Sequence, residues 1–304
     1  MIAALFPGQG SQAVGMAEAL YQGSAAAREV LDRAEAALPG LLGLMFGGPA
    51  ETLTLTENAQ PALLAAGYAA YRAYLEAGGE APAAAAGHSL GEWTAHVAAG
   101  TLALEDALRL VRLRGRYMQA AVPPGEGAMA AVLKVGLEAV RAAIADLPGV
   151  WVANLNAPAQ TVISGRKPAV EEAARRLKAA RARVVFLNVS APFHSPLMQP
   201  AAERLAAELA GVAFADPAFP VYANVTARPV TDGEEARRLL IEQITAPVRW
   251  VETLAAMRAA GLRRFLEFGV GRVLTGLVGR NLADAEARPV ATPAEAREAA
   301  EWKA

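Results

Sequence analysis

The sequence of 304 residues contains no cysteine and only three histidines, His88, His96 and His194. The absence of cysteine excludes disulfides, thiolate catalysis and thiolate-bound metal centres. The charges nearly cancel, with 29 basic and 30 acidic side chains, which argues against a protein built to coat nucleic acid. No apolar run reaches the roughly 20 residues of a membrane helix, and the start MIAALFPGQG lacks the basic segment of a signal peptide. We therefore expect a cytoplasmic protein without a membrane or nucleic-acid partner.

Helical and strand patterns alternate along most of the chain, which is typical of an α/β fold. Residues 2–6 are predicted as a buried strand, and Ala83–Ala86 as another, because this glycine-bounded apolar run precedes a G-x-S-x-G motif. Thr292-Pro293-Ala294-Glu295 is a capping box that predicts a last helix. Further predicted elements are helices over 24–38, 59–77, 90–99, 104–121, 197–210, 234–244, 247–260 and 272–282, and strands over 219–225 and 263–269.

A middle segment follows a different pattern, and proline-rich stretches flank it. Its elements are predicted as strand 128–135, helix 136–146, strands 150–155 and 160–164, helix 168–180 and strand 183–189. This order, βαββαβ, is typical of a ferredoxin-like fold. The sequence therefore predicts a discontinuous large domain over 1–124 and 190–304, with a ferredoxin-like subdomain inserted at 125–189.

The segment Gly87-His88-Ser89-Leu90-Gly91 fits a nucleophile elbow, in which a sharp strand-to-helix turn exposes the serine. The start of the following helix would aim the Leu90 amide at an incoming oxygen. The same pattern also arises by chance in glycine-rich chains. The predicted strand before it and helix after it are the context that the motif requires.

The loop Pro7-Gly8-Gln9-Gly10-Ser11-Gln12 follows the first predicted strand. Gly8-x-Gly10-x-x-Ala13 fits a loose dinucleotide-binding fingerprint, with Asp32 as its acidic residue. That fingerprint needs its acid at a strand end, whereas Asp32 lies inside a predicted helix. We therefore favour a loop that donates a backbone N–H to an oxyanion.

A serine nucleophile needs a base. His88 is part of the elbow backbone, and His96 lies on the next helix, where a structural role is expected. His194, on the loop that leaves the insert, is the natural base, and the alternative interpretation is a loop residue that leads into a helix. No acidic residue occurs in 173–202, so a distant acid, a backbone carbonyl or an amide would have to hold its Nδ1–H.

Arg114 is the arginine on the apolar face of the predicted helix 104–121. Its neighbours three and four residues away are Leu110, Val111, Tyr117 and Met118. A buried guanidinium requires an anionic or hydrogen-bonded partner. Two interpretations stay open, an internal salt bridge or a substrate carboxylate held bidentately.

Together these motifs, in their order and spacing, resemble the malonyl-CoA:acyl carrier protein transacylases of bacterial type II fatty-acid synthesis, over nearly the whole chain. The motifs are FPGQGSQ at 6–12, NAQPAL at 58–63, GHSLGE at 87–92, RGRYMQ at 114–119, GAMAAV at 127–132, NAPAQTVISG at 156–165, APFHSPLM at 191–198, QITAPVRW at 243–250 and EFGVGRVLTGL at 267–277. The resemblance implies an α/β-hydrolase-like large domain that carries the ferredoxin-like insert.

The resemblance also implies a catalytic set. Ser89 would be the nucleophile, and His194 would be the general base and acid. The amides of Gln9 and Leu90 would bind the oxyanion, and Gln243 would orient His194 through its main-chain carbonyl. The malonyl group would pass from CoA to serine, and then to the phosphopantetheine thiol of acyl carrier protein. No metal or other cofactor is expected, since malonyl-CoA is a substrate.

For substrate binding, the resemblance implies that Arg114 pairs with the malonyl carboxylate and that Gln60 and Asn156 line the pocket. Phe193 resembles the residue of malonyl-selective members. Two departures from the family pattern, Trp93 and Val270, leave the pocket shape open.

Acyl carrier proteins of this family are acidic, so a basic face on the insert is a candidate docking site, although a solvated helix surface explains it equally well. The basic residues are Arg175, Arg176, Lys178, Arg181 and Arg183.

Two other functions compete with the transacylase. A serine thioesterase or esterase would share the elbow and the base but would not need Arg114 on an apolar face. A catalytically silent carrier-binding module would not need Ser89 and His194.

Overall fold

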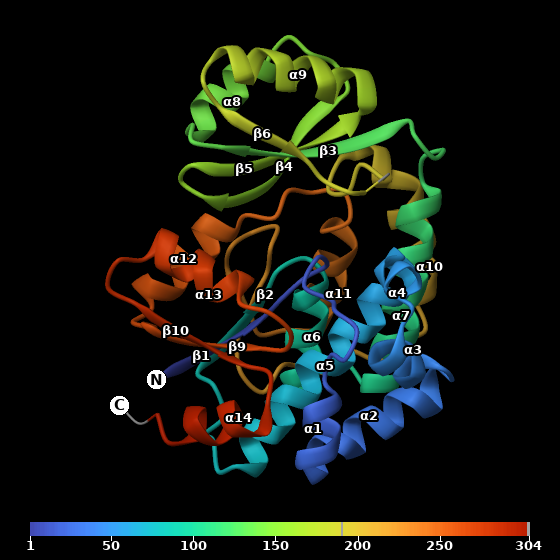
Figure 1. The fold of residues 1–304 in the computed structure, drawn as a ribbon, viewed down its shortest axis with the longest axis vertical. Helices are drawn as coiled ribbons and strands as arrows, with labels where there is room; N and C mark the ends of the chain where they lie inside the picture. Colours follow the sequence, from blue (N-terminus) through green and yellow to red (C-terminus); the bar gives the residue numbers. More distant parts are fainter. Residues whose placement is uncertain (190, 303–304) are drawn as a thin grey trace.

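The computed structural model describes residues 1–189 and 191–302 and contains two separate sheets, each with its own helices (Figure 1). The fold is α/β, as the sequence predicts. Ser190, Lys303 and Ala304, which the sequence assigns to the large domain, lie outside the described residues. Within the described ranges, no helix is both long and apolar enough to cross a membrane.

The larger sheet has six strands in the order β10-β9-β1-β2-β7-β8. All neighbours run parallel except β8, which pairs antiparallel with β7. The strands are β1 (Ile2–Phe6), β2 (Ala84–Gly87), β7 (Val221–Tyr222), β8 (Pro229–Val230), β9 (Arg264–Phe268) and β10 (Glu286–Val290). Since the carboxyl ends of parallel strands share one edge, the segments that follow β1, β2 and β7 meet there, where α/β sheets bind their ligands.

Both faces of the larger sheet are buried, and β1 therefore reads as a continuous apolar run. Ala4 and Phe6 pack with α5, α6 and α7 in the largest hydrophobic cluster. Ala3 and Leu5 pack on the opposite face, where α12 and α13 lie. The bounds of these helices are α5 (Thr56–Glu76), α6 (Leu90–Ala98), α7 (Leu104–Ala120), α12 (Trp250–Ala259) and α13 (Val273–Asn281).

The remaining helices of this part surround the same core. They are α1 (Glu18–Gly23), α2 (Ala25–Ala37), α3 (Leu41–Gly47), α4 (Ala50–Thr54), the 3-10 turn η1 (Pro196–Met198), α10 (Gln199–Leu209), α11 (Gly233–Glu242) and α14 (Pro293–Ala300). The predicted capping box begins α14, because the Thr292 side chain accepts from the Glu295 N–H and the Glu295 carboxylate accepts from the Ala291 N–H.

The smaller sheet is antiparallel, with strand order β4-β5-β3-β6. Its elements follow the predicted succession and are β3 (Gly127–Leu133), α8 (Leu137–Ile144), β4 (Val150–Ala157), β5 (Gln160–Arg166), α9 (Lys167–Ala179) and β6 (Arg183–Phe186). A hydrophobic cluster of its own, which includes Val132, Ile163 and Leu177, joins the sheet to α8 and α9. Both helices cover the outer face, and the other face turns toward the large domain (Figure 1).

A short extended stretch around Val248, outside the segment that forms the smaller sheet, pairs with β4 of that sheet. The Val248 N–H donates to the Ala153 carbonyl at 2.8 Å, and the Leu155 N–H donates to the Val248 carbonyl at 2.9 Å. Strand β4 thereby holds the segment around Val248 against the small sheet. The helix that the sequence predicts from residue 247 therefore begins only at Trp250.

Other differences from prediction concern short elements. The strand predicted over 219–225 is reduced to β7, because the Asn224 N–H donates to the Glu92 carboxylate and not to a neighbouring strand. The predicted strand 183–189 ends at Phe186. Helices α1, α3 and α4 and strands β8 and β10 were not predicted, since elements this short show little periodicity.

Gly91 provides a test of how tightly α6 packs on β1. A Cβ at Gly91 would collide with the main-chain carbonyl of Phe6, whereas a Cβ at Gly276, an exposed glycine of α13, would meet nothing within 4 Å. We expect Gly91→Ala to lower the free energy of unfolding by about 1–3 kcal/mol or more. Gly276→Ala, the matched control, should be neutral or stabilising by up to about 1 kcal/mol. Urea denaturation measures both, and equal stabilities would contradict this packing.

Candidate active site

Ser89 occupies a strained turn between β2 and α6. Its backbone has φ 51° and ψ −105°, a conformation that non-glycine residues rarely adopt. The two glycines of the motif make the turn possible, because a Cβ at Gly87 would collide with the main chain of Gly91 and a Cβ at Gly91 with that of Phe6. The turn thus holds the serine at the carboxyl edge of the larger sheet, as a nucleophile elbow does.

Asn224, which the sequence analysis did not single out, secures this turn from the neighbouring strand. Its Oδ1 accepts from the Ser89 N–H and its Nδ2 donates to the Gly87 carbonyl, both at 2.7 Å. The side chain is fully buried. Asn224 follows β7, which pairs with β2. The available signal was a polar residue at the carboxyl end of the predicted strand 219–225.

His194 contacts the serine directly. Ser89 Oγ lies 2.8 Å from His194 Nε2. On the other side of the ring, Nδ1 lies 3.0 Å from the Gln243 carbonyl oxygen and 3.2 Å from the Ala246 carbonyl oxygen. Carbonyl oxygens only accept, so Nδ1 carries the proton and Nε2 is free to accept the serine proton. Two backbone carbonyls therefore accept the Nδ1–H bond of His194, which a carboxylate accepts in a Ser-His-Asp triad.

The environment of His194 keeps its ring neutral. Burial lowers the pKa of His194 to about 3, and the positive charge of Arg114 acts in the same direction, while the bonds to the Gln243 and Ala246 carbonyls oppose both. A neutral imidazole at ordinary pH can take a proton from serine. The histidine is therefore in the state that a general base requires.

Arg114 reaches the same serine from α7 and is fully buried. Its Nη1 donates to Gln60 Oε1 at 2.7 Å, and its Nη2 donates to Gln243 Oε1 at 2.9 Å and to Ser89 Oγ at 3.0 Å. Among the described residues, no carboxylate forms a salt bridge with it. Burial lowers the pKa of Arg114 to about 10, so the group stays charged at neutral pH. The internal salt bridge that the sequence left open is thus not present in the described part.

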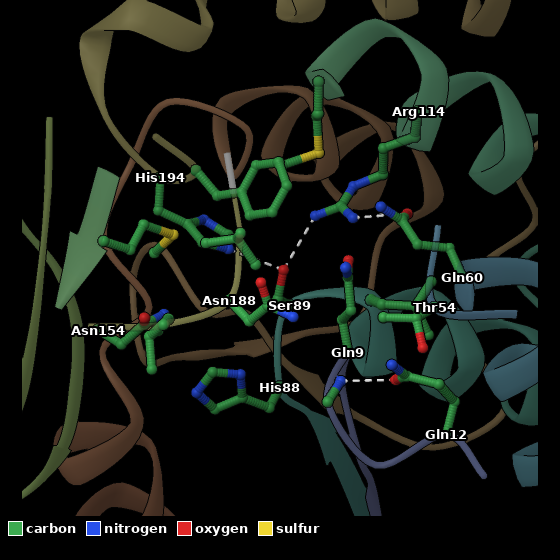
Figure 2. Close-up of a pocket in the computed structure, with 17 residues that line it drawn as sticks. Gln9, Gln12, Thr54, Gln60, His88, Ser89, Arg114, Asn154, Asn188 and His194 are labelled. Carbon is green, nitrogen blue, oxygen red and sulfur yellow. Dashed lines mark hydrogen bonds between the residues drawn. The ribbon is translucent and has the colours of Figure 1, made fainter. Parts of the chain in front are cut away.

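A cavity of about 350 Å³ opens in front of these three side chains, between the two sheets. Figure 2 shows Arg114 and His194 approaching Ser89 from different sides of this cavity. The small domain contributes Met129, Asn154 and Leu187 to its wall. The cavity has the size and the mixed lining of a small-molecule site.

Gln9 and Leu90, the predicted oxyanion pair, both line this cavity. Leu90 is the first residue of α6, so the helix itself offers no acceptor for its N–H. Gln9 lies on the loop after β1, and its side chain donates to Thr56 Oγ1 at 3.2 Å. The two residues thus come together from neighbouring strands at the wall that holds Ser89. Asp32 lies inside α2, which removes the acid that dinucleotide binding would need.

The predicted substrate residues divide into two groups. Gln60 and Phe193 line the cavity. Asn156 is not among the lining residues, because its Oδ1 bonds to His88 Nε2 at 2.8 Å. Asn154, about 7 Å earlier on the same strand, faces the cavity instead. The structure therefore corrects the assignment of Asn156 to the pocket wall and gives it the role of holding His88.

Of the two other histidines, His96 is buried and His88 is partly exposed to the cavity, and they make different contacts. His88 lines the cavity and packs its ring 5.5 Å from that of Trp250. His96 lies on α6 and is buried. Its Nδ1 lies 3.3 Å from Thr101 Oγ1, and the residue does not line the cavity. Burial lowers the pKa of both, that of His96 to about 3. The position of His96 fits the structural role expected from the sequence.

Neither departure from the family pattern lines the cavity. Trp93 is fully buried in α6, and Val270 borders a separate hollow beside Met16 and Thr292. The wall around Ser89 is therefore formed without them.

The basic residues of the insert are only partly available. Arg175 pairs with Glu172 at 2.7 Å, and Arg176 pairs with Glu172 at 2.9 Å and with Asp146 at 2.5 Å. Lys178, Arg181 and Arg183 are exposed. A docking face for an acidic partner would depend on these last three cations.

Comparison with known proteins identifies close relatives. The acyl transferase domain family matches residues 4–296. The malonyl CoA-acyl carrier protein transacylase of Bacillus subtilis (strain 168) is 46% identical over 283 residues, which cover 91% of this chain and 89% of the relative. The enzyme of the same name from Escherichia coli (strain K12) is 43% identical over 281 residues, 91% of each chain.

Solved structures give the same result. The malonyl CoA-acyl carrier protein transacylase from Coxiella burnetii superposes with a TM-score of 0.96 at 40% identity, covering 99% of this chain and 96% of that one. A structure of a type II PKS acyl-carrier protein in complex with its malonyl-transacylase also gives 0.96, at 42% identity and 99% coverage of both chains.

The buried histidines make stability depend on pH. All three have lowered pKa values in the folded protein, whereas in the unfolded chain each protonates near pH 6.5. Glu92, whose pKa burial raises to about 7, is already protonated in the folded state between pH 6 and 5 and offsets one histidine. His96 and His194, with pKa values of about 3 in the folded protein, leave the unfolded state with about one more bound proton. The free energy of unfolding should therefore fall by at least about 1.4 kcal/mol per unit as the pH drops from 6 to 5, and His88 adds to this fall.

His96→Gln isolates one histidine that is remote from the cavity. Its pH slope between 6 and 5 should be smaller than that of the unaltered protein by about 1.4 kcal/mol per unit. Urea denaturation at several pH values gives both slopes. Parallel slopes would show that His96 protonates in the folded state.

Proposed function

Because the chain belongs to the acyl transferase family, we propose that it is a malonyl-CoA:acyl carrier protein transacylase, which transfers a malonyl group from CoA to the phosphopantetheine thiol of acyl carrier protein. The observation that carries this proposal is Arg114. Its charged guanidinium is buried without a direct carboxylate partner among the described residues, 3.0 Å from the candidate nucleophile Ser89. A malonyl group supplies the missing carboxylate next to the thioester carbon that Ser89 attacks.

The first half of the reaction forms an ester on serine. Ser89 Oγ attacks the thioester carbonyl while His194 Nε2 takes its proton, and the Gln9 and Leu90 amides stabilise the oxyanion. The tetrahedral intermediate collapses by breaking the C–S bond. His194 returns the proton to the departing sulfur, so that CoA leaves as the thiol.

The second half reverses these roles. The phosphopantetheine thiol of the carrier protein attacks the malonyl-serine ester while His194 takes the thiol proton. Collapse of the second intermediate breaks the C–O bond, and the proton returns to Ser89 Oγ. Ser89 and His194 supply the nucleophile and all proton transfers, so we propose that the reaction uses no cofactor.

Arg114 gives the site its preference for a carboxylated acyl group. Gln60 and Gln243 hold the guanidinium from within the protein, and Gln60 and Phe193 form the wall around the acyl group. An arriving carboxylate competes for the Nη2 proton that Ser89 Oγ now accepts. We propose that binding malonyl in this way frees the serine oxygen for attack.

The two sheets support a finer description of the fold. We propose that the larger one, with its elbow after β2, belongs to an α/β-hydrolase-like domain over 1–124 and 190–304. The antiparallel order β4-β5-β3-β6 supports a ferredoxin-like subdomain over 125–189. Its exposed cations Lys178, Arg181 and Arg183 are candidates for contact with the acidic carrier protein. We also propose that the enzyme is cytoplasmic.

A serine thioesterase or esterase is the competing function, since it would use the same Ser89 and His194. It would have water as the second acceptor and no need for a buried cation beside the nucleophile. The ratio of malonyl transfer to acyl carrier protein over hydrolysis of malonyl-CoA separates the two functions.

Ser89→Ala should abolish formation of the acyl-enzyme, because among the described residues only the Ser89 side chain places an oxygen within hydrogen-bond distance of His194 Nε2. The measurement is the mass of the protein after incubation with malonyl-CoA, mapped to the peptide that contains Ser89. Ser164→Ala is a matched control, since the Ser164 hydroxyl is buried in β5 without a hydrogen-bond partner, and it should label normally. Labelling of Ser89→Ala at the level of the unaltered protein would refute the assignment.

Arg114→Ala should reduce the preference for malonyl-CoA over acetyl-CoA by about 10- to 150-fold. The reason is the loss of a charge-assisted contact worth roughly 1.5–3 kcal/mol. The kcat/KM values for both thioesters, measured with the same protein preparation, give the ratio and cancel any general loss of activity. An unchanged ratio would exclude carboxylate binding by Arg114.

A further inference from the structure

Glu92 is a buried carboxylate three residues after the nucleophile, and the reaction described above does not use it. It lies on α6 and is fully buried. Its Oε2 accepts from Gln243 Nε2 at 2.7 Å and from the Asn224 N–H at 3.0 Å. Its Oε1 has no hydrogen-bond partner among the described residues. A carboxyl group with so few partners is costly to bury in its charged form, and burial accordingly raises the pKa of Glu92 to about 7.

The contacts of Glu92 determine how the Gln243 side chain is oriented. Gln243 Nε2 donates both to Glu92 and to the Ser89 carbonyl, the latter at 3.0 Å. Its Oε1 faces Arg114 and accepts from Nη2 at 2.9 Å. A carboxylate and a carbonyl only accept, and a guanidinium only donates, so these neighbours permit one amide orientation. Without the acceptor at position 92, the amide loses its stronger partner on the Nε2 side and can turn that nitrogen toward the guanidinium.

This arrangement also separates the two buried charges by one amide group. A carboxylate paired directly with Arg114 would occupy the donors that a substrate carboxylate needs. Glu92 instead acts on Arg114 through Gln243, and the guanidinium keeps its place on the cavity wall. The same Gln243 supplies, through its main chain, the carbonyl that holds His194 Nδ1.

We infer that Glu92 is a positioning residue for Arg114: by holding the Gln243 amide with Oε1 toward the guanidinium, it aims Arg114 at the acyl carboxylate. This inference rests on the proposed function. It assigns malonyl selectivity to a residue that touches neither the substrate nor the guanidinium.

Two variants of Glu92 separate the acceptor from the charge. Glu92→Met removes the acceptor at similar length, and we expect the malonyl-over-acetyl ratio of kcat/KM for acylation of Ser89 to fall about tenfold or more, mainly through KM for malonyl-CoA. Glu92→Gln, the matched control, keeps an oxygen that accepts from Gln243 and Asn224 but removes the negative charge. At about pH 8, where Glu92 of the unaltered protein is ionised, the variant no longer places a competing charge at position 92. The ratio should therefore stay at or above that of the unaltered protein.

Equal ratios in Glu92→Met and the unaltered protein would overturn the inference, as would an equal fall in both variants. If Glu92→Met does not fold, Glu92→Gln decides alone, and a ratio less than about one third of the original would overturn the inference. A general loss of stability lowers acylation by both thioesters and leaves the ratio unchanged. If the unaltered protein does not form malonyl-Ser89 at all, the proposed function fails, which is a different result from a failure of this inference.

Discussion

A positive charge buried beside a nucleophile is the constraint on which the rest of the site depends. Arg114 must stay charged without water, and its direct partners are neutral, namely Gln60, Gln243 and Ser89. The same charge helps to lower the pKa of His194, so the cation also keeps the base neutral. Under the proposed function, one buried guanidinium thus connects recognition of the substrate carboxylate with the protonation state of the proposed base.

The architecture explains how these groups meet although they are far apart in the sequence. Segments after β1, β2 and β7 share the carboxyl edge of the larger sheet and bring Gln9, Ser89 and Asn224 together. The small domain closes the cavity from the other side and, through β4, holds the stretch that follows Gln243. Gln243 then serves both halves of the site, with its carbonyl on His194 and its amide on Arg114.

Much of the site could be predicted because short sequence motifs and helical periodicity indicate the positions of several of its residues. The elbow needs small residues on both sides of Ser89, and those residues form a readable motif. Helical periodicity was sufficient to place Arg114 on the buried face of its helix. Asn156 shows the limit of such reasoning, since the family resemblance assigned it to the pocket, whereas a register shift between Leu155 and Ala157 interrupts the pairing of β4 there and its side chain bonds to His88.

The sequence by itself limits the candidate reactive groups: without cysteine, the serine of the G-x-S-x-G motif is the candidate nucleophile, and the three histidines are the candidate bases. It also determined the α/β alternation and the βαββαβ insert, because these depend on contacts between near neighbours. Only the tertiary structure decided that backbone carbonyls hold His194, that Asn224 secures the elbow and that Glu92 acts on Arg114 through Gln243. These contacts join residues more than forty positions apart, and their geometry exists only when the two sheets are packed together.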